Sequence, residues 1–97
     1  MKGILSVFAG AAVCLASSAA MAAGPDFCHD YTDAALRQVY EARDIGRCRH
    51  ELHLTGQWNN PRWSTDRHVH WDWCRGASRD QADAERDARR EFIDHCR

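Results

Sequence analysis

Residues 74–96 read CRGASRDQADAERDARREFIDHC, a stretch typical of a helix that is framed by two cysteines. Ser78 and Gln81 have the spacing of a capping box, which marks a helix start. One side of the stretch carries Ala77, Ala84, Ala88 and Phe92. Opposite charges four residues apart, such as Glu85 with Arg89, indicate that the other side is solvated. We therefore expect a helix over residues 78–95.

A second stretch of this kind, residues 28–48, reads CHDYTDAALRQVYEARDIGRC. Apolar residues recur at helical spacing from Tyr31 to Ile45, without an intervening Gly or Pro. Asp30 is a suitable N-cap and Gly46 a suitable C-terminal stop. This pattern predicts a helix over residues 31–45, so each of the two helices is flanked by cysteines.

The helices restrict how Cys28, Cys48, Cys74 and Cys96 can pair. A helix rises about 1.5 Å per residue, so the 20 steps from Cys28 to Cys48 span about 30 Å. Bridged Cα atoms lie within about 7 Å, which excludes a bridge across either helix. An antiparallel helical hairpin predicts the pairs Cys28–Cys96 and Cys48–Cys74. The alternative, Cys28–Cys74 with Cys48–Cys96, requires parallel helices, which the connecting segment permits.

The N-terminal residues have the features of an export signal. Lys2 precedes an apolar run, and Ala20-Met21-Ala22 resembles a cleavage site. The run is rich in Ala and Gly, whereas a membrane span needs about 20 strongly apolar residues. We expect residues 1–22 to be a signal peptide, which would remove Cys14 and be the only membrane contact. Residues 23–97 would then form a single disulfide-bonded domain in the periplasm or the external medium.

Composition limits both the core and the partners of this domain. Residues 23–97 contain twelve Arg against fourteen carboxylates, a formal net charge of −2, so nothing favours nucleic acid as a partner. Large aliphatic and Phe side chains number only nine. The Trp and Tyr residues and two disulfides must therefore supply much of the stability. The expected fold is a small all-α domain, a disulfide-stapled antiparallel hairpin with a Trp- and His-rich connection.

The connection, residues 49–73, holds all four Trp and four of the six His. Asn59-Asn60-Pro61 predicts a turn. Beyond it, Val69, Trp71 and Trp73 alternate as in a strand, whereas Trp63, Asp66, His70 and Trp73 have helical spacing. We favour a short helix beginning near Ser64, which would cap it. An irregular segment remains the alternative.

The cysteines and the residues around them form a longer pattern. It runs Cys28-x2-Tyr31, Ala35-Leu36-x-Gln38, Trp63-x2-Asp66-x3-His70-x2-Trp73-Cys74, Glu85-x2-Ala88-Arg89 and Cys96. In this pattern the chain resembles small exported bacterial cysteine-rich domains of uncharacterised function. The resemblance implies one disulfide-bonded domain and brings no catalytic residues. The stretch after Cys48 is longer here than in that pattern.

Three sets of side chains are candidates for a site. Asp66 and His70, four residues apart, could form an acid–base pair, but we expect a structural polar pair because no nucleophile accompanies them. His50, His53, His68 and His70 have spacings that could bind Zn²⁺ or Cu²⁺. Charging the His residues near pH 6.5 could also make the protein respond to acid.

The third set is aromatic. Trp58 and Trp71, with Arg62 and Asn59, could bind an envelope glycan or a protein partner, because exposed Trp stacks on sugar rings and anchors interfaces. We expect Trp63 and Trp73 to be buried and Trp58 and Trp71 to be exposed. The sequence thus favours a non-enzymatic binding or structural module of the cell envelope, with His-mediated metal binding or buffering as the alternative.

Overall fold

The computed structural model describes residues 22–97, which form an all-α domain stapled by two disulfides, as the sequence predicts. The expected signal peptide and Cys14 lie outside the described residues, apart from Ala22. The elements are α2 (Pro25–Asp44), α3 (Gly46–Leu54), the 3-10 turn η1 (Pro61–Trp63), α4 (Arg67–Arg75) and α5 (Arg79–Cys96). No helix within residues 22–97 is long and apolar enough to cross a membrane.

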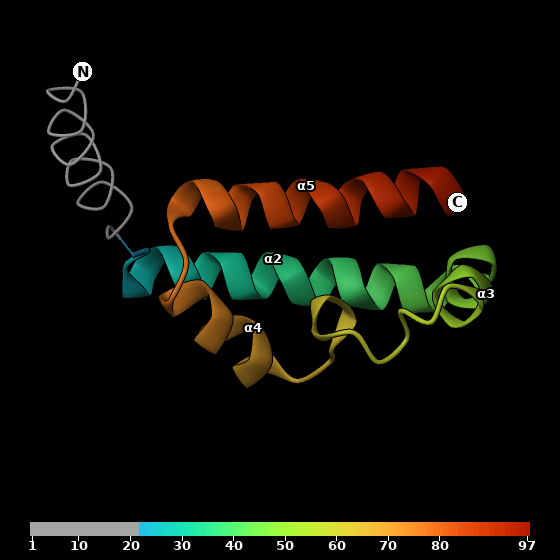
Figure 1. Ribbon diagram of the computed structural model, residues 1–97, viewed down its shortest axis with the longest axis horizontal. Helices are drawn as coiled ribbons and strands as arrows, with labels where there is room; N and C mark the ends of the chain where they lie inside the picture. The colour runs from blue at the N-terminus through green and yellow to red at the C-terminus, as the bar shows by residue number, and fades with distance from the viewer. Residues whose placement is uncertain (1–21) are drawn as a thin grey trace, which may run out of the picture.

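The two long helices, α2 and α5, lie side by side and run in the same direction (Figure 1). The contacts follow the same order along both segments. Just before the helices, the Ala23 N–H donates to the Ala77 carbonyl; within them, Gln38 donates to the Arg86 carbonyl and Glu41 pairs with Arg90. The expectation of an antiparallel hairpin is therefore wrong. The segment from α3 through α4 returns the chain to the start of α2, so α5 sets out from the same end as α2 (Figure 1).

The disulfides follow from this parallel arrangement. They join Cys28 to Cys74 and Cys48 to Cys96, with Cα–Cα distances of 5.7 and 5.0 Å. The preferred pairing of Cys28 with Cys96 and Cys48 with Cys74 is wrong, because those residues lie at opposite ends of the parallel pair. The two observed bridges fasten the two ends of the molecule separately.

The first helix is longer than the periodicity predicts, and it ends one residue earlier. Pro25 occupies the first turn of α2, where its fixed φ and missing N–H are tolerated, and Gly24 rather than Asp30 is the N-cap. At Ile45 the backbone becomes extended, and Gly46 begins α3 instead of ending the structure. Helix α3 is not predicted by the sequence pattern, because its apolar residues Cys48, Leu52 and Leu54 are few.

The two later helices have side-chain caps. The Asp66 carboxylate accepts a hydrogen bond from the His68 N–H at 2.9 Å, so Asp66 caps α4 and Ser64 lies before the helix. The capping box predicted for α5 is confirmed: the Gln81 N–H donates to the Ser78 hydroxyl at 3.1 Å and the Ser78 N–H to the Gln81 side chain at 2.9 Å.

The core consists of two apolar clusters separated by a polar layer. One cluster lies around the Cys48–Cys96 bridge and includes Trp63, and the other surrounds the Cys28–Cys74 bridge. Between them Arg89 and Gln38 are buried, and Arg89 donates hydrogen bonds to Gln38 and to the hydroxyl of Tyr31, whose ring belongs to the second cluster. The polar layer is the structural basis of the site described below.

Candidate functional site

A trough runs along α5, between it and the α3–η1–α4 segment. It exists because α4 and α5 both pack on α2 but make few contacts with each other. Three hollows make up the trough, and each shares lining residues with the next: Arg62 lies between the first and second, and Glu85 and Trp73 between the second and third. We call them the α3–α5 groove, the central pocket and the α4–α5 hollow.

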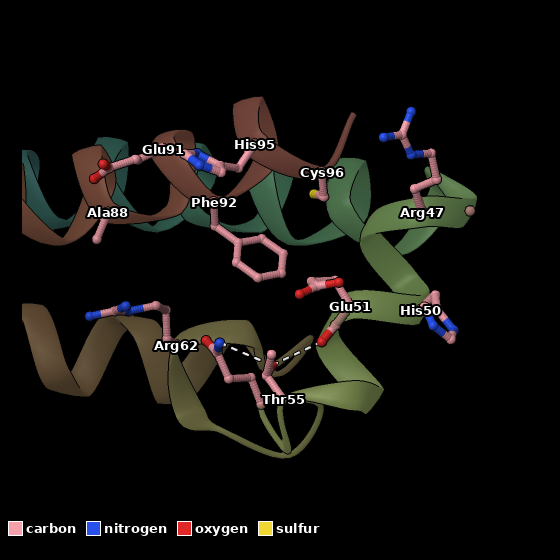
Figure 2. Close-up of a pocket in the computed structure, with 12 residues that line it drawn as sticks. Arg47, His50, Glu51, Thr55, Arg62, Ala88, Glu91, Phe92, His95 and Cys96 are labelled. Carbon is pink, nitrogen blue, oxygen red and sulfur yellow. Dashed lines mark hydrogen bonds between the residues drawn. The ribbon is translucent and has the colours of Figure 1, made fainter.

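The α3–α5 groove is the largest hollow, with a volume of about 790 Å³. Figure 2 shows the Phe92 ring pointing from α5 into the gap, opposite Glu51 and Thr55 of the α3 side. Cys96, whose disulfide joins α5 to α3, closes one end of it. Apart from Phe92 and the disulfide, its walls carry exposed charged side chains such as Arg47 and Glu91. The groove is therefore open to solvent, with charged side chains around an apolar floor.

The central pocket is smaller, about 290 Å³, and its walls are more specialised. It is lined by Tyr31, Asn60, Pro61, Arg62, Val69, His70, Trp73, Glu85 and Arg89. Arg89 is fully buried, and so is all but 1% of Tyr31. A buried guanidinium is costly unless its charge and its N–H groups are compensated, which makes the partners of Arg89 informative.

Arg89 is held by neutral groups of α2. Its Nε donates to the Gln38 side-chain oxygen at 2.8 Å, and its Nη2 donates to the Tyr31 hydroxyl, also at 2.8 Å. Within residues 22–97, Nη1 has no hydrogen-bond partner. No carboxylate is hydrogen-bonded to this guanidinium in the part of the chain that the structure describes. Leaving a buried donor unsatisfied costs about 1–3 kcal/mol, so an acceptor at Nη1 would be stabilising.

The nearest carboxylate on α5 is engaged elsewhere. Glu85 binds Arg62 through two hydrogen bonds, from Nε and from Nη2, the latter at 3.1 Å. This bidentate pair raises the pKa of Arg62 and forms the wall between the central pocket and the α3–α5 groove. Arg62 and Glu85 neutralise each other, so the positive charge of Arg89 stays uncompensated in the central pocket.

Two other groups of the central pocket are neutral at pH 7. Burial lowers the pKa of His70, and the charge of Arg89 lowers it further, against the opposing effect of a hydrogen bond to the Ser64 carbonyl. The His70 Nε2 lies 2.7 Å from that carbonyl oxygen, so it carries the proton. Burial also raises the pKa of Tyr31 despite its bond to Arg89. With Arg62 and Glu85 compensating each other, the pocket has a formal charge of +1.

Trp73 lies at the edge of this pocket, where it also lines the α4–α5 hollow. It is 42% exposed, so the expectation that it is buried is wrong. The reason is the phase of α4: His70 and Cys74 face inward, four residues apart, and Trp73 lies to one side of them. Its ring centroid is 5.6 Å from that of Tyr31, which places an accessible aromatic surface next to the buried polar layer.

The expected aromatic surface is divided in the structure. Trp58 packs against the cluster at the Cys48–Cys96 end and Trp71 against the cluster at the other end, and both are half-buried rather than exposed. Trp58 lies between the His53 ring, stacked at 4.0 Å, and the Arg43 guanidinium, 3.9 Å from its centroid. The expectation that Trp63 is buried is confirmed. Of the residues expected to bind a partner, Arg62 lines the trough, whereas Asn59 is exposed beside it and lines none of the three hollows.

Asp66 and His70 each have a separate structural partner. The Asp66 carboxylate caps α4 through the His68 N–H, and the His70 ring bonds to the Ser64 carbonyl. Both contacts fasten the turn between η1 and α4. Asp66 Oδ1 and His70 Nε2 are thus each bonded to the backbone of this turn rather than to one another.

The four His residues considered for Zn²⁺ or Cu²⁺ lie in different environments. His53 stacks on Trp58, His70 is buried in the central pocket, His50 borders the α3–α5 groove, and His68 is exposed on α4. Among residues 22–97 no three His, Cys, Asp or Glu side chains are grouped closely enough to hold a metal ion.

Sequence reasoning did not single out Arg89, Tyr31 or Glu85 as site residues. The expectation that Glu85 and Arg89 pair on a solvated face is wrong, because Arg89 is buried and Glu85 binds Arg62. A signal for Arg89 is present, because it lies seven residues after Ala82 and four before Ile93, on the inward face of a helix with few other charges there. An arginine at a core position of an amphipathic helix needs a partner, and no acidic residue of α2 occupies the facing position. The burial of Tyr31 and Gln38 on α2 then completes the layer.

No protein-family model matches the chain, and no curated protein or solved structure is significantly similar to it. The resemblance to exported cysteine-rich domains accordingly stays a prediction. The function is therefore argued from the geometry of the trough alone.

Proposed function

We propose that this chain is a non-enzymatic binding module of the periplasm or the external medium, and that the trough binds a glycan strand. The two disulfides support the compartment, because such bridges persist where the surroundings are oxidising. One bridge joins α3 to α5 across the trough, and the other ties α4 to α2, on which α5 also packs, so the walls of the trough are held in place. A preorganised surface of this kind binds with little loss of conformational entropy.

The observation that carries the proposal is the position of Trp73. It is the exposed aromatic residue of the trough, and it borders two adjacent hollows whose other walls combine polar side chains with small apolar ones. Sugar rings bind proteins through such combinations, because their C–H faces stack on an aromatic ring while their hydroxyls bind side chains around it. Asn60, Arg62 and Glu85 supply hydrogen-bonding groups beside Trp73. A row of hollows along one helix suits a linear polymer better than a single compact ligand.

The proposed module is non-enzymatic because the reactive side chains of the region are engaged in structure. Every cysteine in the described residues is in a disulfide. His70, the histidine of the central pocket, bonds to a backbone carbonyl with a depressed pKa, and Asp66 caps a helix. Neither has the nucleophile or the second titratable partner that general acid–base catalysis needs.

The test is a titration of the mature, oxidised protein with glycan oligosaccharides, followed by calorimetry. We expect a Trp73→Ala variant to bind at least tenfold more weakly, which corresponds to about 1.4 kcal/mol. Tyr40→Ala is the matched control, because Tyr40 is also an exposed aromatic residue, 52% exposed on α2, and lines none of the three hollows. Equal affinity of the two variants, or no binding by the wild-type protein, would refute the proposal.

A further inference from the structure

We infer that the buried guanidinium of Arg89 receives one carboxylate of the ligand, so that the central pocket selects a sugar unit that carries a carboxylate, such as a uronic acid. This inference rests on the proposed function and specifies its ligand. It gives a ligand-binding role to Arg89, whose buried positive charge would otherwise be uncompensated.

The first support is the geometry of the guanidinium. Nε and Nη2 lie on one edge of the group, and that edge faces Gln38 and Tyr31 of α2. Nη1 lies on the other side, without a partner among residues 22–97, and Arg89 lines the central pocket. The bonds to α2 fix the orientation of the guanidinium before a ligand arrives. Guanidinium N–H groups bind carboxylate oxygens strongly and directionally.

The second support is the charge of the pocket. Arg62 is compensated by Glu85, so one positive charge, that of Arg89, remains for the ligand. A monoanion neutralises it. A dianion such as hydrogen phosphate would add a second negative charge near Glu85, whose repulsion is strong at short range in a partly buried site. The pocket therefore favours a carboxylate over phosphate.

The third support is the relation between the two binding positions. The Tyr31 hydroxyl accepts from Arg89 Nη2 at 2.8 Å, and the Tyr31 ring lies 5.6 Å from the Trp73 ring. Arg89, which provides the anion position, and Trp73, which provides the exposed aromatic face, both line the central pocket. A carboxylate attached directly to a sugar ring can occupy the first position while its ring lies near the second. Acetate lacks the ring, and a neutral sugar lacks the charge, so each should bind more weakly than the combination.

The experiment compares four small probes, glucuronate, glucose, acetate and inorganic phosphate, by calorimetry and by nuclear magnetic resonance on the oxidised wild-type protein. The Arg89 Nε–Hε signal is the reporter, because this donor is buried and hydrogen-bonded to Gln38. We expect glucuronate to bind at least tenfold more tightly than glucose, acetate or phosphate and to shift that signal in a saturable way.

Two variants complete the test. Arg89→Gln should reduce glucuronate affinity at least tenfold, whereas Arg37→Gln, which removes an equal charge from an exposed site on α2 outside the trough, should change it less than twofold. If Arg89→Gln does not fold, the wild-type reporter signal decides the matter. An unshifted Arg89 signal, or equal binding of glucuronate and glucose, would overturn the inference.

The outcomes also separate this inference from the proposed function. Neutral and acidic oligosaccharides that bind equally well, with loss of binding in Trp73→Ala, would retain the glycan-binding trough and remove the carboxylate site. Binding of glucuronate at Arg89 without any binding of longer strands would retain the carboxylate site and refute the glycan-binding trough. Tighter binding of phosphate than of glucuronate would replace the carboxylate by another anion and so contradict the inference.

Discussion

Removal of the Cys28–Cys74 bridge by the double substitution Cys28→Ala, Cys74→Ala should strongly destabilise the domain. The bridge joins residues 46 positions apart and fastens the last turn of α4 to the first turn of α2. Closing a loop of that length is worth about 4 kcal/mol in the chain-entropy treatment. The second bridge, with a separation of 48, spans an overlapping part of the chain, so part of this constraint persists in the variant. We therefore expect a loss of about 3 kcal/mol.

Urea unfolding followed by far-ultraviolet circular dichroism measures this loss. A domain of about 75 residues has a free energy of unfolding of roughly 4–11 kcal/mol, so the midpoint should fall by a large fraction. The slope against urea should rise, because the unfolded chain becomes less compact. The control repeats the comparison after reduction of wild type and variant, which leaves only the lost packing of two buried sulfurs. An unchanged midpoint under oxidising conditions would refute the reasoning.

Two further predictions concern a helix cap and a buried histidine. Ser78→Ala should lower the free energy of unfolding by about 1 kcal/mol and Ser78→Gly by only a few tenths, as read from urea midpoints, since the hydroxyl caps α5; equal midpoints for Ser78→Ala and wild type would contradict this. His70 has a lowered pKa in the folded state, where it faces Arg89, Asp66, Glu85 and the Ser64 carbonyl, so the unfolded chain takes up the proton first. Stability should hence fall as the pH drops below about 6.5, the ordinary value for His, and His70→Asn should flatten the dependence between pH 7 and 5; the same slope in both proteins would count against it.

The local features of the fold were accessible from sequence, because they depend on residues close together in the chain. The start of α5 follows from the Ser78–Gln81 box. The shortage of aliphatic residues correctly indicates that Trp63 is buried, but the same reasoning fails for Trp73, which is exposed. The long-range arrangement was not accessible. Helical periodicity does not reveal direction, and only the path of α3, η1 and α4 back along α2 makes α2 and α5 parallel. The disulfide pairing follows from that path.

The site was missed for a related reason. Sequence reasoning looked for it among the Trp and His residues of the connection, since these are rare and chemically versatile. In the structure Trp58 and Trp71 pack against the two apolar clusters. The positive charge of the trough comes instead from Arg89 on α5, which is hydrogen-bonded to Tyr31 on α2. These two residues are 58 positions apart, and only their burial in one layer shows that they act together.

The central claim, that the trough binds an acidic glycan with Arg89 at the carboxylate and Trp73 at the ring, is tested most directly by a crystal structure of the oxidised protein with a glucuronate-containing oligosaccharide. We predict density in the central pocket with a carboxylate oxygen within hydrogen-bond distance of Arg89 Nη1 and a sugar ring against the exposed face of Trp73. An oligosaccharide bound outside the trough, or a central pocket that is empty at saturating ligand, would contradict the claim.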